Sequence, residues 1–271
     1  MNIPVHRLKH ALALVDCAVA RKATLPITQN VLFQGGKLVA TNLEIAVSAD
    51  LPEAAGFHHT LPYKPLVDIL RHIPNTEVAA IERDGGTVTL TAGGTRATLY
   101  GTDAADFPPL PTVPGEGEPV DGDRLLKALV EAVPYTAINE SRPVLRAVCV
   151  TLGDVIEVAG ADGFRLAWQE TPLKLTGAGS GLKQLLVPRE TVLALDKVWK
   201  RAIKPPAAGS QFPSPDLNPD AGPSASLAMA RMAVARRMMQ VRITTSQASF
   251  RFGEAPSTPS SWPGNSPTTS S

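Results

Sequence analysis

Long hydrophobic runs are absent from this 271-residue chain, and none approaches the roughly 20 apolar residues that a membrane-spanning helix needs. The net charge is only +1, which excludes a uniformly basic nucleic-acid binder. Aromatic residues make up 5% of the chain, too few to predict base-stacking platforms. Cys17 and Cys149 stand far apart without CxxC spacing, so we expect buried thiols in a reducing cytoplasm.

Apolar residues, 44% of the chain, recur with helical and strand periods. The first twenty residues mix charges into a helical pattern, so they predict an amphipathic helix and no signal peptide. Helices are predicted over 5–20, 64–72, 123–135 and the segment after Pro188. Strands are predicted at 30–33 and 37–41, around Gly93-Gly94, at 144–151 and 154–160, and in a last hairpin that pairs Val241 and Ile243 with Phe250 and Phe252.

Part of the first half has a counterpart about 120 residues later. Pro26 corresponds to Pro143, and Asn42 corresponds to Asp162. A repeat this long indicates two copies of one domain rather than a solenoid. We therefore expect an α+β fold with two tandem domains, each with two helices packed on antiparallel sheets. The domains are predicted at 1–114 and 119–253, divided by a segment rich in proline and glycine.

Two segments depart from this pattern. Residues 205–226 hold six prolines and read as a loop-like insertion before the last hairpin. Residues 227–239, with four methionines and three arginines, predict a helical extension of the insertion; a membrane-surface or partner helix is the alternative. Thirteen of the eighteen residues in 254–271 are Ser, Thr or Pro, so we expect this tail to be disordered.

Charge is distributed unevenly between the predicted elements. Counted over 5–22, 64–72, 122–142 and 188–204, the four helical segments sum to +7, whereas the remaining residues before the insertion sum to −8. One interpretation is that lysine and arginine simply favour helices. The other is a set of helix faces that meets phosphates without reading bases, which predicts sequence-independent, salt-sensitive binding.

Several motifs resemble the bacterial sliding clamp, the beta subunit of DNA polymerase III. The resemblance covers roughly 1–204 and 238–253. The motifs are Lys22-Ala23-Thr24-Leu25-Pro26-Ile27, Ala40-Thr41-Asn42-Leu43-Glu44-Ile45, Asp106-Phe107-Pro108, Arg142-Pro143-Val144-Leu145, Ala161-Asp162-Gly163-Phe164-Arg165-Leu166-Ala167 and Val187-Pro188-Arg189.

The resemblance implies a non-catalytic, cytoplasmic processivity factor of DNA replication, without cofactor, metal or membrane contact. Family members form head-to-tail rings around double-stranded DNA, and they bind the replicative polymerase and the clamp loader through short peptide motifs. The residues at positions implied to contact DNA phosphates are Lys22, Arg71, Arg142, Lys197 and Arg201. For each of them a solvated helix charge is the alternative.

The family also binds peptides in a hydrophobic pocket on its second domain. The residues at matching positions are Leu145, Ala161, Gly163, Phe164, Arg165, Leu166 and, as a possible addition to the wall, Val241. Gly163 is expected to keep the backbone open to the peptide. Phe164 stands where the family commonly has histidine, which makes the pocket more apolar. The alternative is that Leu145 and Leu166 belong to the core.

Other chemistry has weaker support. His58-His59 lacks a third metal ligand at a useful spacing, and Gly35-Gly36-Lys37 reads as a hairpin turn rather than a phosphate loop. Asp162-Gly163 is a turn signal before it is a catalytic carboxylate. A two-domain hydrolase that uses Asp162 or His58 is nevertheless the competing class of function.

Bacterial clamps have three domains, and the resemblance covers only two. The tail from 254 begins where the family continues through a Gly-x-Phe-Pro-x-Tyr linker, so we hypothesise a gene fragment or frameshift, which reading the downstream frames for that pattern would test. We expect a monomer or weak self-association; three two-domain chains in one ring are the alternative. The runner-up function is a degenerate clamp fragment that binds peptides without encircling DNA.

Overall fold

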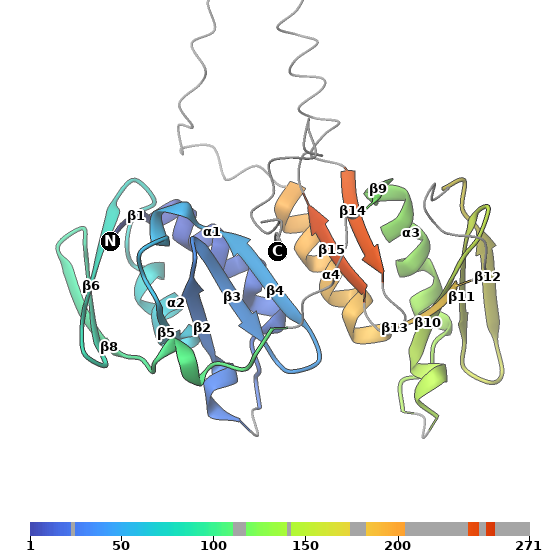
Figure 1. Ribbon diagram of the computed structural model, residues 1–271, viewed down its shortest axis with the longest axis horizontal. Coiled ribbons are helices and arrows are strands. Elements are labelled where there is room, and N and C mark those ends of the chain that lie inside the picture. Colours follow the sequence, from blue (N-terminus) through green and yellow to red (C-terminus); the bar gives the residue numbers. More distant parts are fainter. Residues whose placement is uncertain are drawn as a thin grey trace, which may run out of the picture. The chain divides into compact units, whose positions relative to one another are not determined.

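The computed structural model describes residues 1–22, 25–110, 118–139, 142–173, 183–203, 238–243 and 248–252. The chain divides into two compact units (Figure 1). Unit 1 comprises Met1–Thr112 with Pro188–Asn218, and unit 2 comprises Val113–Val187 with Pro219–Ser271. The insertion at 205–226, the tail at 254–271 and most of the helix predicted at 227–239 lie outside the described residues.

Unit 1 contains two four-stranded antiparallel sheets and three helices, α1 (Val5–Val15), α2 (Tyr63–Arg71) and α4 (Arg189–Ile203). One sheet has the order β1 (Asn2–Pro4), β6 (Val78–Asp84), β7 (Thr87–Ala92), β8 (Thr95–Tyr100). The other has the order β4 (Ala46–Asp50), β3 (Lys37–Thr41), β2 (Asn30–Gln34), β5 (His59–Pro62). The strand before each of α1 and α2 belongs to the sheet whose other strands follow the other helix. β1 precedes α1 but pairs with β6, which follows α2, and β5 precedes α2 but pairs with β2, which follows α1.

The core of unit 1 lies between the helices and the sheets. Residues three or four apart on α1 present one buried stripe, which is why this sequence forms an amphipathic helix. Leu66 and Leu70 provide the same contact from α2. Each fully buried leucine contributes about 1.5–3 kcal/mol relative to an exposed one. The stripe on α1 consists of Val5, Leu8, Ala11, Leu12 and Val15.

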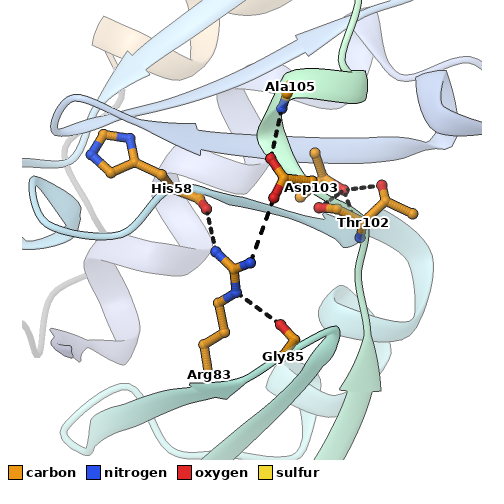
Figure 2. A network of polar contacts seen from close by, with 7 residues as sticks. His58, Arg83, Gly85, Thr102, Asp103 and Ala105 are labelled. Atoms are coloured by element: carbon orange, nitrogen blue, oxygen red, sulfur yellow. Dashed lines mark hydrogen bonds and ion pairs between the residues drawn. The ribbon is translucent and has the colours of Figure 1, made fainter.

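A polar network joins the two sheets of unit 1 (Figure 2). Arg83 on β6 donates to the carbonyl of His58 at 2.9 Å and to that of Gly85 at 2.8 Å, and lies 3.7 Å from Asp103. Next to it, the Thr60 amide donates to the carbonyl of Thr102 at 3.0 Å. The network therefore fastens β5 to the chain that leaves β8.

Unit 2 again has two antiparallel sheets, which accompany the helix α3 (Gly122–Ala132). One sheet has the order β12 (Leu166–Glu170), β11 (Ile156–Ala161), β10 (Ala147–Leu152), β13 (Lys183–Pro188). The other has the order β15 (Ala248–Phe252), β14 (Met238–Ile243), β9 (Glu118–Asp121). The strand before α3 again pairs with a strand far along the chain, since β9 pairs with β14 and not with the strands that directly follow α3. The predicted fold class, two copies of one α+β domain, is confirmed.

Some local predictions need correction. The strand predicted from 144 begins at Ala147, because Pro143–Arg146 form a 3₁₀ turn in which Pro143 fixes the first backbone angle. Met238 and Met239 belong to β14 and not to a helix. In the last hairpin Val241 pairs with Phe250 as predicted, but Ile243 pairs with Ala248 and Phe252 pairs with Met239.

Candidate functional site

The loop between β11 and β12 is a turn held by the Asp162 side chain. Its Oδ1 accepts from the amides of Phe164 at 2.9 Å and Arg165 at 2.7 Å. Between them Gly163 has φ = +90°, a conformation that disfavours other residues. These hydrogen bonds lower the pKa of Asp162 to about 2. Asp162 is thus the turn-forming residue that its sequence context predicts.

Two of the predicted peptide-site residues and one predicted DNA contact meet at this loop. A Cβ built on Gly163 would lie 3.9 Å from Cδ1 of Leu145 and 3.4 Å from Nη2 of Arg142. Leu145 is half-buried, on the 3₁₀ turn that precedes β10. The fold therefore places Arg142 beside the predicted peptide residues.

Large apolar side chains stand exposed on the same loop and strand. Phe164 is 99% exposed and Leu166 is 69% exposed, so Leu166 does not belong to the core. Ala161 pairs directly with Leu166 across β11 and β12. Exposed apolar clusters of this kind mark interaction surfaces in soluble proteins.

Arg165 is held against the loop rather than extended from it. Its guanidinium donates to Oδ2 of Asp162 at 2.7 Å and to the carbonyl of Pro134 at 3.4 Å, and it lies 5.9 Å from the centre of the Tyr135 ring. It therefore braces the loop against the segment after α3. Val241 lies in a different sheet, on β14 opposite Glu118 of β9, and its part in the peptide site stays a prediction.

The corresponding loop of unit 1 has the same hydrogen bonds. Oδ1 of Asn42 accepts from the amides of Glu44 at 3.0 Å and Ile45 at 2.9 Å. Leu43 takes the position of Gly163 with φ = +75° and is 62% exposed. The predicted correspondence of Asn42 with Asp162 is therefore also a structural correspondence.

A shallow pocket of about 120 Å³ opens between α1 and α2. Lys9 at its rim donates to the carbonyl of Ile73 at 2.7 Å and to Asn75 at 2.8 Å. Arg71 at the end of α2 is exposed and lies 3.2 Å from Asp68. The residues that line the pocket are Lys9, Leu12, Ala13, Tyr63, Val67, Leu70 and Arg71.

Asp16, at the end of α1, organises the polar contacts nearby. It accepts from the Tyr63 hydroxyl at 2.9 Å and lies 3.3 Å from Arg201 of α4. Arg201 also donates to the carbonyl of Ala13, so its positive charge lies at the carboxyl end of α1, where the helix dipole favours it. Burial and the neighbouring carboxylate raise the pKa of Tyr63, which stays a hydrogen-bond donor.

The predicted DNA contacts therefore have different surroundings. Lys22 and Lys197 are exposed, the first on the segment after α1 and the second on α4. Arg71 is exposed beside Asp68, whereas Arg142 lies beside Gly163 and Arg201 is half-buried beside Asp16. Within the bounds that the structure gives them, the four helices carry a net charge of +5.

His58 and His59 do not form a shared site. His59 is 1% exposed, and burial lowers its pKa, whereas His58 faces solvent. Across the described ranges, no three His, Cys, Asp or Glu side chains gather as metal ligands would. Within those ranges, no helix has both the length and the apolar character needed to cross a membrane.

Sequence reasoning missed several residues of these candidate surfaces. Asp16 and Tyr63 follow from no motif, because their contact joins residues 47 positions apart. Trp168 could have been found, since it follows Phe164 and Leu166 at alternate positions of a strand and such residues share a face. It is 56% exposed.

The two-unit architecture has the fold of solved DNA polymerase sliding clamps. The crystal structure of a DNA polymerase sliding clamp from Pseudomonas aeruginosa superposes with a TM-score of 0.70 at 22% identity, covering 94% of this chain and 62% of that one. At this identity the likeness establishes the fold.

Sequence comparisons find similarity to the same proteins over part of the chain. Residues 1–111 match the N-terminal domain of the DNA polymerase III beta subunit family. The chain is 33% identical to the beta sliding clamp of Synechocystis over 188 residues, 62% of this chain and 47% of that one. It is 29% identical to the beta sliding clamp of Escherichia coli K12 over 200 residues, 70% and 53% of the two chains. The chain is thus similar to bacterial beta sliding clamps, and it spans about half the length of the curated proteins that it matches.

Proposed function

We propose that this chain acts as a sliding-clamp processivity factor in the cytoplasm, a non-catalytic accessory subunit that tethers a replicative polymerase to duplex DNA. The observation that carries the proposal is the duplicated clamp unit, with basic helices and an exposed apolar loop. The competing hydrolase has less support, since both carboxylate oxygens of Asp162 are engaged in the turn.

DNA binding in this proposal uses long-range attraction between helix charges and phosphates. Lys22 and Lys197 are the best candidates because both are exposed, whereas Arg201 already lies beside Asp16. Contacts to phosphate release counterions, so the affinity should fall steeply with salt and should not depend on base sequence.

Charge reversal tests this part of the proposal. Lys22→Glu and Lys197→Glu should weaken binding to duplexes of any sequence, and each should reduce the slope of log affinity against log salt by about 1, because one phosphate fewer is neutralised. Lys37→Glu is the matched control because Lys37 is exposed on a sheet hairpin. Equal effects of all three changes, or a strong preference for one sequence, would contradict the proposed surface.

Peptide binding uses the loop at Gly163. Leu145, Phe164 and Leu166 offer apolar surface, and Gly163 carries no side chain that would cover it. A short peptide with two or three apolar residues fits this chemistry, and polymerases or clamp loaders are the proposed sources of such peptides.

Polymerase processivity on a primed circular template, measured with the clamp loader present, tests the whole function. Longer products in the presence of this chain are the expected result. The degenerate binding module is favoured instead if the chain binds the peptide but leaves product length unchanged. Hydrolytic turnover abolished by Asp162→Ala would overturn both.

A further inference from the structure

The apolar surface at the Gly163 loop continues along the outer face of β12. Leu166, Trp168 and Glu170 alternate on this strand, so their side chains share one face, and all three are exposed. The residues opposite Leu166 and Trp168 on β11 are both alanines, which leave the two large side chains uncovered on that side. An open apolar strip, Leu166 and Trp168, therefore runs from the loop toward Glu170.

The strip ends at two carboxylates that face each other across the strands. Glu170 of β12 pairs with Glu157 of β11. The Thr171 amide donates to the carbonyl of Ile156 at 2.8 Å, so alternation makes the two glutamates a non-hydrogen-bonded pair, the kind in which side chains lie closest. Like charges directly opposite one another are destabilising. Within the described ranges no ion pair uses either glutamate, so no described cation offsets their repulsion.

Trp168 lies where it can share a cation with this pair. Its indole N–H donates to Oε2 of Glu157 at 3.3 Å, which holds the ring next to the carboxylates. A cation is attracted to the face of a tryptophan ring, and a guanidinium group forms strong hydrogen bonds with carboxylates. An exposed indole beside two carboxylates therefore suits the side chain of an arginine or a lysine.

The other end of the strip carries the opposite charge. Arg142 lies beside Gly163, and Arg165 belongs to the loop itself. From Leu166 to Glu170 an extended strand advances about 13 Å. A peptide that lies extended along this face thus meets guanidinium groups at the loop and carboxylates about four residues further on.

We propose that Glu157, Trp168 and Glu170 form a subsite for a basic residue, which makes the peptide site selective for apolar segments followed or preceded by an arginine or a lysine. The inference rests on the proposed peptide binding and adds to it the charge of the partner. The occupant is a peptide because the subsite continues the apolar surface of the Gly163 loop, and its end is basic because charges across an interface complement one another. The repulsion within the glutamate pair is then relieved on binding, as expected where a local rule is broken at a functional position.

Fluorescence anisotropy of the full chain with three labelled peptides tests the proposal. All three contain the same apolar segment of two leucines and a phenylalanine. One has an arginine about four residues after the segment, the second has it about four residues before the segment, and the third has glutamine at both places. One of the two arginine peptides should bind about fivefold more tightly than the glutamine peptide, with an advantage that falls as salt is added. The other should gain nothing, because its arginine lies at the end of the strip next to Arg142.

Variants of the subsite separate its charge from its apolar surface. The double change Glu157→Gln and Glu170→Gln should abolish the advantage of the arginine peptide and leave the affinity for the glutamine peptide unchanged. Trp168→Leu, which keeps an apolar side chain, should reduce the advantage to about twofold because the carboxylates remain. Glu82→Gln removes the same charge from an exposed position of β6 in unit 1, so it is the matched control and should change neither affinity. Circular dichroism establishes that each variant is folded.

A measurement without peptide tests the repulsion itself. Glu170→Gln should raise the midpoint of chemical denaturation, because it removes one of two like charges that lie opposite each other. A lower midpoint would contradict the unrelieved pair on which the inference depends.

The peptide results distinguish this inference from the proposed function. Equal affinities for all three peptides, an equal gain for both arginine peptides, or an advantage that survives in the double variant would overturn the subsite and leave the peptide site in place. If none of the three peptides binds, the proposed peptide binding fails and the subsite fails with it.

Discussion

The loops at Asn42 and Asp162 share one backbone and differ in chemistry. Both hold two amides on one side-chain oxygen and place the next residue at positive φ. Unit 2 has glycine there, followed by Phe164 and an arginine paired with Asp162, whereas unit 1 has Leu43, followed by Glu44 and Ile45. The two loops therefore share their backbone conformation, and the proposed binding surface of unit 2 depends on the side chains that differ.

Substitution of Gly160 is expected to have the largest effect on the free energy of unfolding. It lies on β11, and a Cβ there would be 2.5 Å from the carbonyl oxygen of Ala132. By the repeat its counterpart is Ala40, whose Cβ fits a fully buried place on β3. Gly160→Ala should reduce the free energy of unfolding by about 1–3 kcal/mol, measured with a chemical denaturant.

Ala40→Gly is the reciprocal control, and it should cost only about 0.5–1 kcal/mol through weaker packing and gained chain entropy. A stable Gly160→Ala chain would mean that α3 does not approach β11 as closely as described.

Substitutions at the two positive-φ positions, Gly163 and Leu43, should change the stability less and in opposite directions. Gly163→Ala should destabilise the chain by about 1 kcal/mol, because a side chain is strained at this φ while its Cβ makes only ordinary contacts. Leu43→Gly should stabilise it by about 0.5 kcal/mol, since relief of strain exceeds the added entropy of the unfolded chain. Thermal unfolding of both variants measures the two signs, and equal signs would contradict the shared frame.

The smallest effect concerns pH. Asp162 has a folded-state pKa of about 2, below the unfolded value of about 3.9. Its contribution is therefore present above about pH 4 and is lost as the pH falls toward 2. Asp162→Asn, which copies the loop of unit 1, should remove this pH dependence. Denaturation between about pH 5 and pH 2 compares the two chains, and parallel curves would show that Asp162 titrates normally.

The sequence predicted what is local and what is repeated. Helices α1 to α4 follow from apolar spacing, and the hairpins at Gly35-Gly36 and Gly93-Gly94 follow from turn chemistry. The 3₁₀ turn at Pro143 was not predicted because its apolar residues resemble those of a strand. The pairing of β1 with β6 and of β9 with β14 joins residues far apart in the sequence, so no local pattern encodes it.

The candidate site was predicted less completely. The residues around Gly163 follow from their motif, because one short segment supplies most of them. Arg201 does not follow, since its contact with Asp16 joins residues 185 positions apart and gives it a partner other than phosphate. Val241 is implied only by the resemblance, and because its strand pairs in another sheet its part in the site stays a prediction.

Peptide binding at the Gly163 loop is the central claim, and fluorescence anisotropy measures it directly. The probe is a labelled peptide in which two leucines and a phenylalanine are flanked by polar residues. Leu166→Ala should weaken binding about tenfold because it removes apolar surface from the site, whereas Leu43→Ala, at the corresponding loop of unit 1, should leave the affinity unchanged. Equal losses of affinity in both variants, or no loss from Leu166→Ala, would contradict the account.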